Sequence, residues 1–555
     1  METNIVQTPS GALKGKISDE VLSFHGVPYA QPPVGNRRFR SPVPIAWDGV
    51  RDATESGPAS YQINSSNLAR VSRLIEELDP GVPGVMSWPA YVGKTYNQDV
   101  TSEDCLYLDI WRPSGMKPGQ RLPVYVYYHG GANSVSAGSF RLERGSNLAR
   151  QENIIVVRPN YRMGALGWVH FSLISAEEFP EATNLGLQDQ IAALRWVYDH
   201  IESLGGDREN ITIGGESAGG TAVSHLLTYP GTQQLVRRAI IQSLSPFNVW
   251  CTQQKEEAAV IARRYLQLLR IQHDPTKLHG IDPDYFLAVH NILCRQFPAD
   301  ANIAWSPVGG VVDGEFIPDT PALALSQMVY PRPDFELMIG FAKDEWQFFR
   351  GHTATMTNGT EADALAIIEQ VFGQEQARKV WKRYRDLYPT HAPGHLASDI
   401  MSMEFFKYSS LTIATNFAKQ GFAVYVFQFS YDLPGLGGYL RAVHTGDVPF
   451  IFRNYTDEDL IMWPGFDGVD NDEIARISTN FGQLYGSFIK QGVPGSRWPA
   501  FSPERQTVLW VGKEVVAKER LLESEQKGFM EAGITSFAVL QTRILQNTRQ
   551  VIGML

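Results

Sequence analysis

The chain contains 555 residues, of which 43% are hydrophobic and 19% are charged, a balance typical of globular proteins with a large buried core. The formal net charge is −10 and no long run of lysine and arginine occurs, which argues against nucleic acid as a partner. No apolar stretch reaches the roughly 18 residues that a membrane-spanning helix needs. The N-terminal segment lacks the pattern of an export signal and the chain has only three cysteines, so we expect a cytoplasmic protein.

Predicted strands and helices alternate along the chain. Short strand-like pieces occupy the first 60 residues, and further on the segments LYLDIW, LPVYVYYH, NIIVVRPNY and NITIGG have the apolar, β-rich composition of buried strands. Between the last two, apolar residues recur at three- and four-residue steps from Leu187 to Ile201, which predicts a helix that Gly205 ends. Three later segments have the composition of strands of the same sheet: 239–244, 335–341 and 423–431.

Helical insertions are expected among these later strands, at 253–270 and 361–387, and a final helix is expected within 519–550. Because strands alternate with helices, the sheet should be mostly parallel and covered by helices on both faces. No proline- or serine-rich linker divides the chain. We therefore expect one α/β domain over residues 1–555, with small N-terminal strands and helical cap insertions.

A glycine-rich turn follows the strand-like segment NITIGG. Residues 215–219, GESAG, form a G-x-S-x-G sequence between a predicted strand and a predicted helix, which is the context of a nucleophile elbow. A sharp turn at this place projects the hydroxyl of Ser217 clear of the backbone, and the N-terminus of the following helix favours negative charge nearby. The alternative is an ordinary glycine-rich turn without chemistry.

A serine nucleophile needs a base and an acid that orients the base, and in α/β-hydrolases the acid and then the histidine follow the serine along the chain. His444 lies in a loop after a strand-like segment, whereas His129 precedes the serine and His225 lies in the helix directly after it. His444 is therefore the candidate base, against the alternative of a solvated loop histidine. Asp344 and Glu345 both follow a predicted strand, and their spacing does not choose the acid.

The segment HGGAN, residues 129–133, follows a predicted strand. Its two glycines allow backbone angles that other residues resist. The tetrahedral intermediate of acyl transfer carries an oxyanion, and rigid backbone N–H groups stabilise it. In α/β-hydrolases one of these donors follows the nucleophile, here at Ala218, and the others come from a glycine-rich loop after an early strand. HGGAN is thus the candidate for that loop.

The chain as a whole resembles the type-B carboxylesterase/lipase family, which includes cholinesterases and fungal lipases. Similar segments occur in the family's order through almost the whole chain: FHGVPYAQPPVGNRRFRSP, SEDCLYLDIWRP, RPNYRMGALGW, NLGLQDQIAALRWVYDHI, GGESAGGTAV, GFAKDEWQFF and HTGDVPFIF. The resemblance implies an α/β-hydrolase fold. It also implies a serine hydrolase that cleaves small-molecule carboxylic esters through an acyl-enzyme, without a metal or other cofactor.

The resemblance assigns roles to residues of this chain. It implies that Ser217 is the nucleophile, Glu345 the acid and His444 the base. By the same resemblance, the oxyanion donors are the N–H groups of Gly131, Ala132 and Ala218. Two internal ion pairs of the family are matched by Arg38 with Glu103 and by Arg162 with Asp189.

The residues implied to lie at the substrate pocket include several departures from the family's pattern. Ala132 and Asn133 stand where the family usually has a third glycine and an aromatic residue, so they should crowd or polarise the site of the alcohol group. Leu244 replaces a glycine near the site, while Ser243 matches a buried accessory serine. The remaining implied pocket residues are two tryptophans, Trp250 at the acyl pocket and Trp88 at the entrance.

The cysteines also depart from the family. The usual partner of Cys105 is absent, since Ser60 lies in that region, so Cys105 should be a free buried thiol. Cys251 and Cys294 are separated more widely than the family's second disulfide loop, and their pairing stays open. Residues 60–100 are expected to form a lid or cap over the site, against the alternative of plain surface packing.

Three functions fit the sequence. The first is hydrolysis of carboxylic esters. The second keeps the acyl-enzyme but passes the acyl group to an alcohol or amine, cleaves a thioester or closes a lactone. The third is a binding protein without catalysis, which the intact Ser217, Glu345 and His444 argue against. The sequence does not identify the ester, and it allows a monomer or a homodimer.

Overall fold

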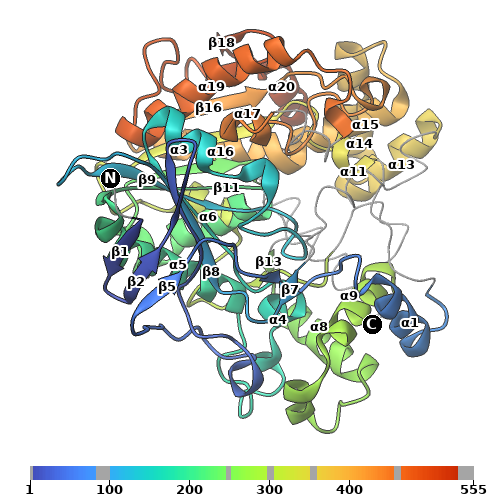
Figure 1. The fold of residues 1–555 in the computed structure, drawn as a ribbon. Helices are drawn as coiled ribbons and strands as arrows, with labels where there is room; N and C mark the ends of the chain where they lie inside the picture. The colour runs from blue at the N-terminus through green and yellow to red at the C-terminus, as the bar shows by residue number, and fades with distance from the viewer. Residues whose placement is uncertain are drawn as a thin grey trace.

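The computed structural model of the chain describes residues 4–82, 100–244, 252–296, 306–350, 359–455 and 464–534. Its strands are β1 (Ile5–Thr8), β2 (Gly11–Lys14), β3 (Lys16–Ser18), β4 (Val21–Pro28), β5 (Val50–Asp52), β6 (Ala59–Ser60), β7 (Thr101–Ser102), β8 (Tyr107–Pro113), β9 (Leu122–Tyr128), β10 (Ile155–Pro159), β11 (Gly206–Glu216), β12 (Arg238–Gln242), β13 (Thr252–Gln253), β14 (Gly310–Val311), β15 (Glu336–Ala342), β16 (Ala423–Phe429), β17 (Thr507–Val511) and β18 (Val515–Glu519). An eleven-stranded sheet with the order β18-β17-β16-β15-β12-β11-β9-β10-β8-β4-β3 forms the centre of the described structure (Figure 1).

The middle of this sheet is parallel. The seven strands from β17 to β10 in the sheet order pair in parallel, and antiparallel strands extend both edges. Every residue of β10 and β12 is buried, as expected for strands covered on both faces. The carboxyl ends of β9, β11, β15 and β16 share one edge, so the loops that follow these strands meet there.

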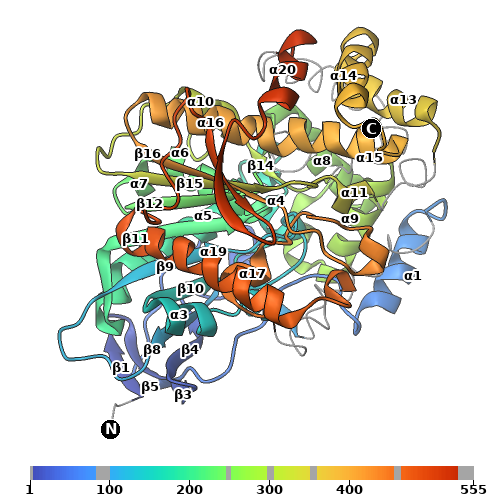
Figure 2. The same ribbon diagram turned by 90° about the horizontal axis from the view of Figure 1, so that it is seen from above.

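Helices cover both faces of the sheet. They are α1 (Leu68–Leu78), α3 (Ser146–Glu152), α4 (Gly164–Trp168), α5 (Leu185–His200), α6 (Ala218–Thr228), α7 (Pro230–Gln233), α8 (Lys255–Leu268), α9 (Pro283–Gln296), α10 (Pro321–Gln327), α11 (Gln347–Arg350), α13 (Glu361–Phe372), α14 (Gln374–Leu387), α15 (Pro393–Ser402), α16 (Tyr408–Lys419), α17 (Val448–Phe452), α19 (Asn471–Gln491) and α20 (Glu523–Glu531). In Figure 2, α5, α6, α10 and α16 lie on one face and α3, α17 and α19 on the other. The predicted α/β architecture with a mostly parallel sheet is thus confirmed.

The helical insertion predicted at 361–387 and the final helix predicted within 519–550 are both present. The segment 361–387 forms α13 and α14 because Gly373 interrupts the helix with a φ of 73°. The helix expected within 519–550 is short, since β18 ends at Glu519 and α20 spans only Glu523–Glu531 of the described residues. The helix predicted to stop at Gly205 is confirmed: α5 continues into a 3-10 turn that Gly205 caps with a φ of 84°.

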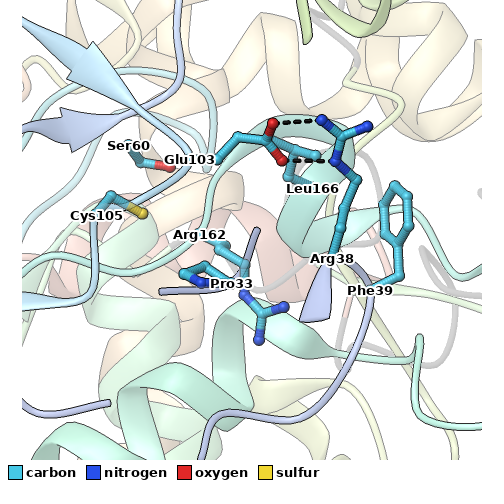
Figure 3. Close-up of a pocket in the computed structure, with 8 residues that line it drawn as sticks. All are labelled: Pro33, Arg38, Phe39, Ser60, Glu103, Cys105, Arg162 and Leu166. Atoms are coloured by element: carbon cyan, nitrogen blue, oxygen red, sulfur yellow. Dashed lines mark hydrogen bonds and ion pairs between the residues drawn. The ribbon is translucent and has the colours of Figure 1, made fainter. Parts of the chain in front are cut away.

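Two buried ion pairs join segments that lie apart along the chain. Arg38 donates through Nε to Glu103 at 2.7 Å, and Arg162 donates through Nη2 to Asp189 at 2.7 Å, as the resemblance to the family implies. Figure 3 shows the small pocket that these arginines line together with Cys105. Both pairs are largely shielded from solvent, so losing one partner would leave a poorly solvated charge.

Cys105 is free and fully buried, as predicted from the absence of its partner. Burial raises the pKa of its thiol to about 12, which keeps the sulfur protonated and unreactive. The nearby Ser60 instead accepts a hydrogen bond from the backbone N–H of Met163 at 3.0 Å. Cys294 is free too, and Cys251 lies outside the described residues. Within the described residues, no helix is both long and apolar enough to cross a membrane.

Candidate active site

The turn at Ser217 connects β11 to α6 and is strained. Ser217 has φ 58° and ψ −122°, a backbone conformation that residues with a side chain rarely adopt. Its N–H donates to the carbonyl of Gln242 at 3.0 Å, which ties the turn to the neighbouring strand β12. A Cβ on Gly219 would lie 2.0 Å from the carbonyl oxygen of Tyr128, so only glycine fits beside the serine. The predicted elbow geometry is therefore present.

A histidine and a carboxylate meet on the loops after β15 and β16. Nδ1 of His444 lies 2.5 Å from Oε2 of Glu345, and both side chains are buried. The other oxygen of Glu345, Oε1, accepts from the backbone N–H of Ala342 at 2.7 Å, which fixes the carboxylate. A proton on Nδ1 is held by Glu345, so Nε2 is left as the atom that accepts a proton.

Asp344, the other candidate acid, contacts the residues just before His444. Its N–H donates to the carbonyl of Ala442 at 2.9 Å, and its Oδ2 accepts from the N–H of Ala442 at 3.3 Å. Its second oxygen, Oδ1, lies 3.2 Å from Nη1 of Arg441. Asp344 thus anchors the backbone just before His444. Of the two neighbouring acids, only Glu345 contacts the imidazole among the described residues.

A second carboxyl group, missed by the sequence analysis, lies on the opposite side of the imidazole. Oε1 of Glu216, at the end of β11, is 3.2 Å from Nε2 of His444. Burial lowers the pKa of His444, but the charges of Glu216 and Glu345 raise it more, to about 9. Burial also raises the pKa of Glu216 well above its usual value. When Glu216 is protonated it carries no charge, and His444 is then more easily kept neutral.

The HGGAN loop bends through three consecutive residues with positive φ: Gly131 (101°), Ala132 (52°) and Asn133 (55°). A Cβ on Gly131 would lie 2.1 Å from the carbonyl oxygen of Val135, so the bend requires glycine there. The loop also lies against the serine turn, since a Cβ on Gly130 would be 3.2 Å from Cβ of Ser217.

The competing histidines have other roles. The ring of His129 stacks on Tyr161 with centroids 4.4 Å apart, and its Nδ1 lies 2.8 Å from the carbonyl oxygen of Gly130. Burial lowers the pKa of both His129 and His225 to about 3, which keeps both rings neutral. Neither contacts the carboxylates around His444 among the described residues.

Three phenylalanines that sequence reasoning missed surround the His444 ring. The ring centroids of Phe348, Phe349 and Phe406 lie 5.7, 5.3 and 5.2 Å from that of His444. Phe348 and Phe349 follow Glu345 closely in DEWQFF, so their nearness to the candidate acid could have marked them as neighbours of the histidine. Phe406 comes from a π-helical turn, Met403–Lys407, between α15 and α16, and the sequence pattern does not mark it. These rings make the surroundings of the histidine apolar.

The proposed pocket residues are described in part. Asn133 and Ser243 are buried, and neither Oδ1 of Asn133 nor Oγ of Ser243 has a hydrogen-bond partner in the described ranges. Leu244, next to Ser243, is fully buried. Trp88 and Trp250 lie outside the described residues.

α/β-Hydrolases carry the reactive serine on this kind of strained strand-to-helix turn, and the fold together with the turn puts the chain in that class. The sequence profile of the carboxylesterase family matches residues 2–530, and the chain belongs to that family. The predicted family is therefore confirmed, and with it the predicted activity class, carboxylic ester hydrolase.

Individual proteins agree with this assignment. A para-nitrobenzyl esterase of Bacillus subtilis (strain 168) is 31% identical over 542 residues, which cover 96% of this chain and 100% of that esterase. A phenmedipham hydrolase of Pseudarthrobacter oxydans is 29% identical over 92% of this chain and 95% of its own. The crystal structure of a Geobacillus stearothermophilus carboxylesterase has a TM-score of 0.79 and 30% identity, over 95% of this chain and 99% of that one.

Proposed function

We propose that the protein hydrolyses carboxylic esters through an acyl-enzyme on Ser217, with His444 as general base and Glu345 as the acid that orients it. The observation that carries this proposal is the contact of 2.5 Å between Nδ1 of His444 and Oε2 of Glu345, at the sheet edge that also bears the strained Ser217 turn. A serine hydroxyl is a poor nucleophile unless such a base removes its proton.

In this mechanism Nε2 of His444 takes the proton of Ser217 as the hydroxyl attacks the ester carbonyl, and returns it to the leaving alcohol. Glu345 holds the Nδ1 proton and stabilises the imidazolium. Water then hydrolyses the acyl-enzyme with His444 as base again. The phenylalanines around the imidazole exclude bulk water, which strengthens the electrostatic contacts within the site.

The backbone N–H groups of Gly131, Ala132 and Ala218 form the oxyanion hole in this proposal. The close approach of Gly130 to Ser217 supports it, because it brings the HGGAN loop against the nucleophile. Ala218 begins α6, and the N-terminus of that helix adds favourable potential for a developing negative charge. Removing one such donor lowers kcat by about 10²–10³-fold.

Asn133, Ser243, Leu244, Trp88 and Trp250 are proposed to line the substrate pocket. The unpaired polar atoms of Asn133 and Ser243 support a role beside substrate, because buried polar atoms are rarely left without partners. The names of the two relatives refer to different substrates, a para-nitrobenzyl ester and phenmedipham, so similarity does not fix the ester.

We also propose that the segment 60–100 covers the site; its residues 83–99 lie outside the described residues. The described part of this segment is bonded to the chain just after the HGGAN loop: Gln62 donates through Nε2 to the carbonyl of Ser136 and accepts at Oε1 from its N–H, both at 2.9 Å. Helix α1 of the same segment packs on α9. The free thiol of Cys105 is consistent with the reducing cytoplasm that we propose as the protein's location.

A fluorophosphonate probe and a p-nitrophenyl acetate burst test the proposed function. We expect mass spectrometry to find the probe on Ser217 and the burst to release about one p-nitrophenol per chain. Both results follow from a covalent serine intermediate. Ester hydrolysis by a chain that the probe does not label at Ser217 would contradict the proposal.

Ala132→Gly is expected to widen tolerance for bulky, branched alcohol groups. The change removes a methyl beside the proposed oxyanion donor and relaxes a residue with φ 52°. The ratio of kcat/KM for tert-butyl acetate to that for ethyl acetate, measured by pH-stat, should rise about tenfold. A change of this size is expected when one or two methyl groups in a pocket no longer clash.

Asn153→Gly is the matched control for the Ala132 variant. Asn153 caps α3 with a similar φ of 55°, away from the serine turn, so its replacement relaxes the backbone without touching the pocket. It should leave the ratio of the two esters unchanged. An unchanged ratio in Ala132→Gly as well would remove Ala132 from substrate selection.

A further inference from the structure

A serine at the end of α15 is bonded to the loop that carries Glu345. Oγ of Ser402 accepts a hydrogen bond from the backbone N–H of Trp346, the residue after Glu345, at 2.8 Å. The same oxygen donates its hydrogen to the carbonyl of Ser398, four residues earlier on the helix, at 2.7 Å. Because the single hydroxyl hydrogen is used there, the lone pairs of Oγ are left to accept from Trp346. Ser402 thus joins the helix to the loop.

The bond fixes the peptide group between Glu345 and Trp346. Ser402 holds the N–H of this group, and its carbonyl oxygen, which belongs to Glu345, accepts from the N–H of Phe348 at 3.3 Å. A peptide group is planar, so bonds at both of its ends leave it little freedom to turn. The orientation of this plane helps to set the direction of the Glu345 side chain. Of the two bonds, the one to Ser402 comes from a distant segment, 56 positions along the chain.

The bond lies in buried, apolar surroundings. The side chains of Glu345, Trp346 and Ser402 are all buried, and the ring centroid of Phe405 lies 4.7 Å from that of Trp346. A buried N–H group that loses its acceptor is costly. Without the hydroxyl of Ser402, the loop is therefore expected to shift until the N–H of Trp346 finds another acceptor, and Glu345 shifts with it.

Ser402 also lies where the α-helix changes into the π-helical turn that carries Phe406. Two neighbouring residues of that turn contact different parts of the site. The ring of Phe405 packs on Trp346, beside the acid, whereas the ring centroid of Phe406 lies 5.2 Å from that of His444, the base. π-Helical turns are rare and are frequent at functional sites. This one contacts the loop of the acid and the ring of the base together.

We propose that Ser402 is a positioning residue for ester hydrolysis: its hydroxyl holds the peptide after Glu345 so that the carboxylate stays on His444. The inference rests on the proposed function, in which Glu345 orients His444. Ser402 acts through Glu345, whose Oε2 lies 2.5 Å from Nδ1 of the imidazole. A displaced carboxylate orients the ring less well and stabilises the imidazolium less.

The first test is the steady-state kinetics of Ser402→Ala with p-nitrophenyl acetate. We expect kcat to fall about 10–10²-fold, because a displacement of about 1 Å at an active site has an effect of this size. KM should change little, since the acid acts on the imidazole rather than on the bound ester. The rate at which the fluorophosphonate probe labels Ser217 should fall by a similar factor.

A double-mutant cycle shows whether Ser402 acts through Glu345. Glu345→Gln removes the group that Ser402 positions, so adding Ser402→Ala to it should lower kcat by less than about threefold further. A serine that only supported the fold would lower kcat by the same factor in both backgrounds. The cycle therefore separates positioning of the acid from general stabilisation.

Ser224→Ala is the matched control. Ser224, on α6, is also a fully buried helical serine, and it donates to the carbonyl of Gly220, four residues earlier, at 2.9 Å. It shares the helical bond of Ser402 but, within the described ranges, accepts none from the loop of the acid. Its replacement should lower kcat less than Ser402→Ala does, and by the same factor whether or not Glu345 is replaced.

Ser402→Cys covers the case in which Ser402→Ala does not fold. The thiol is close to the hydroxyl in size but accepts hydrogen bonds weakly, so this variant should show the same pattern in the cycle. Equal losses of kcat with and without Glu345, or a loss no larger than that of Ser224→Ala, would overturn the inference. These outcomes leave the proposed function intact as long as the probe labels Ser217 in the unmodified protein. A failure of the proposed function appears instead as absent labelling at Ser217.

Discussion

Ser217→Ala should lower kcat for p-nitrophenyl acetate by about 10⁴–10⁶-fold, because no other hydroxyl group occupies the strained turn between β11 and α6. The residual rate comes from the oxyanion donors alone, which act on a bound ester attacked by water. The fluorophosphonate probe should no longer label the chain. Steady-state kinetics at several ester concentrations separates the loss of kcat from any change in KM.

The fold should tolerate this substitution. The structure gives the Ser217 hydroxyl no hydrogen bond within the described ranges, while the backbone bonds of the turn remain in the alanine variant. The free energy of unfolding should therefore change by about 0.5 kcal/mol or less, measured by urea denaturation.

A matched serine checks the specificity of the effect. Ser224 lies on the same helix, α6, is fully buried and donates to the carbonyl of Gly220 at 2.9 Å. Ser224→Ala should cost some stability but keep kcat within about tenfold, since mutations away from the reacting atoms act mainly through stability. Hydrolysis by Ser217→Ala at the rate of Ser224→Ala would rule out the serine mechanism.

Local sequence patterns predicted the features of the site that depend on short stretches of chain. The strand, the glycines and the helix around Ser217 are contiguous, so the elbow follows from steric demands visible in GESAGG. The parallel sheet follows similarly from the alternation of strands and helices. The resemblance to the family then added Glu345, which spacing alone did not select.

Contacts between distant segments were not predictable in this way. Trp346 and Ser402 are separated by 56 positions, so no local pattern joins them. The same is true of Phe406, which a π-helical turn brings to His444. Such contacts depend on how the insertion after β15 packs on the sheet. Helix periodicity does not encode that packing.

The choice between Asp344 and Glu345 shows this limit at two neighbouring residues. Consecutive residues after a strand point in different directions, and which of them faces the histidine depends on where the loop after β16 lies. In the structure Glu345 contacts His444, and Asp344 contacts Ala442 and Arg441. The two carboxylates are therefore a natural pair for mutation.

Glu345→Gln should lower kcat by about 10³–10⁴-fold with little change in KM, the effect expected when a triad acid becomes an amide. The amide carries no charge to stabilise the imidazolium, and it no longer restricts the ring to the tautomer with the proton on Nδ1. Labelling by the fluorophosphonate probe should slow by a similar factor, which measures the loss of nucleophile activation directly.

Asp344→Asn should have the opposite balance of effects. It removes a charge that lies 3.2 Å from Nη1 of Arg441, so it should cost about 1–3 kcal/mol of unfolding free energy, as measured by urea denaturation. The carboxamide keeps an oxygen for the N–H of Ala442, and the His444 loop stays close to its place, so kcat should fall by about tenfold at most.

Equal losses of kcat in Glu345→Gln and Asp344→Asn would mean that the loop anchor, rather than the contact with His444, sets the rate. A greater loss in Asp344→Asn would assign the acid to Asp344. Under the proposed mechanism the rate follows the residue that touches the imidazole, and the stability follows the residue that anchors the loop.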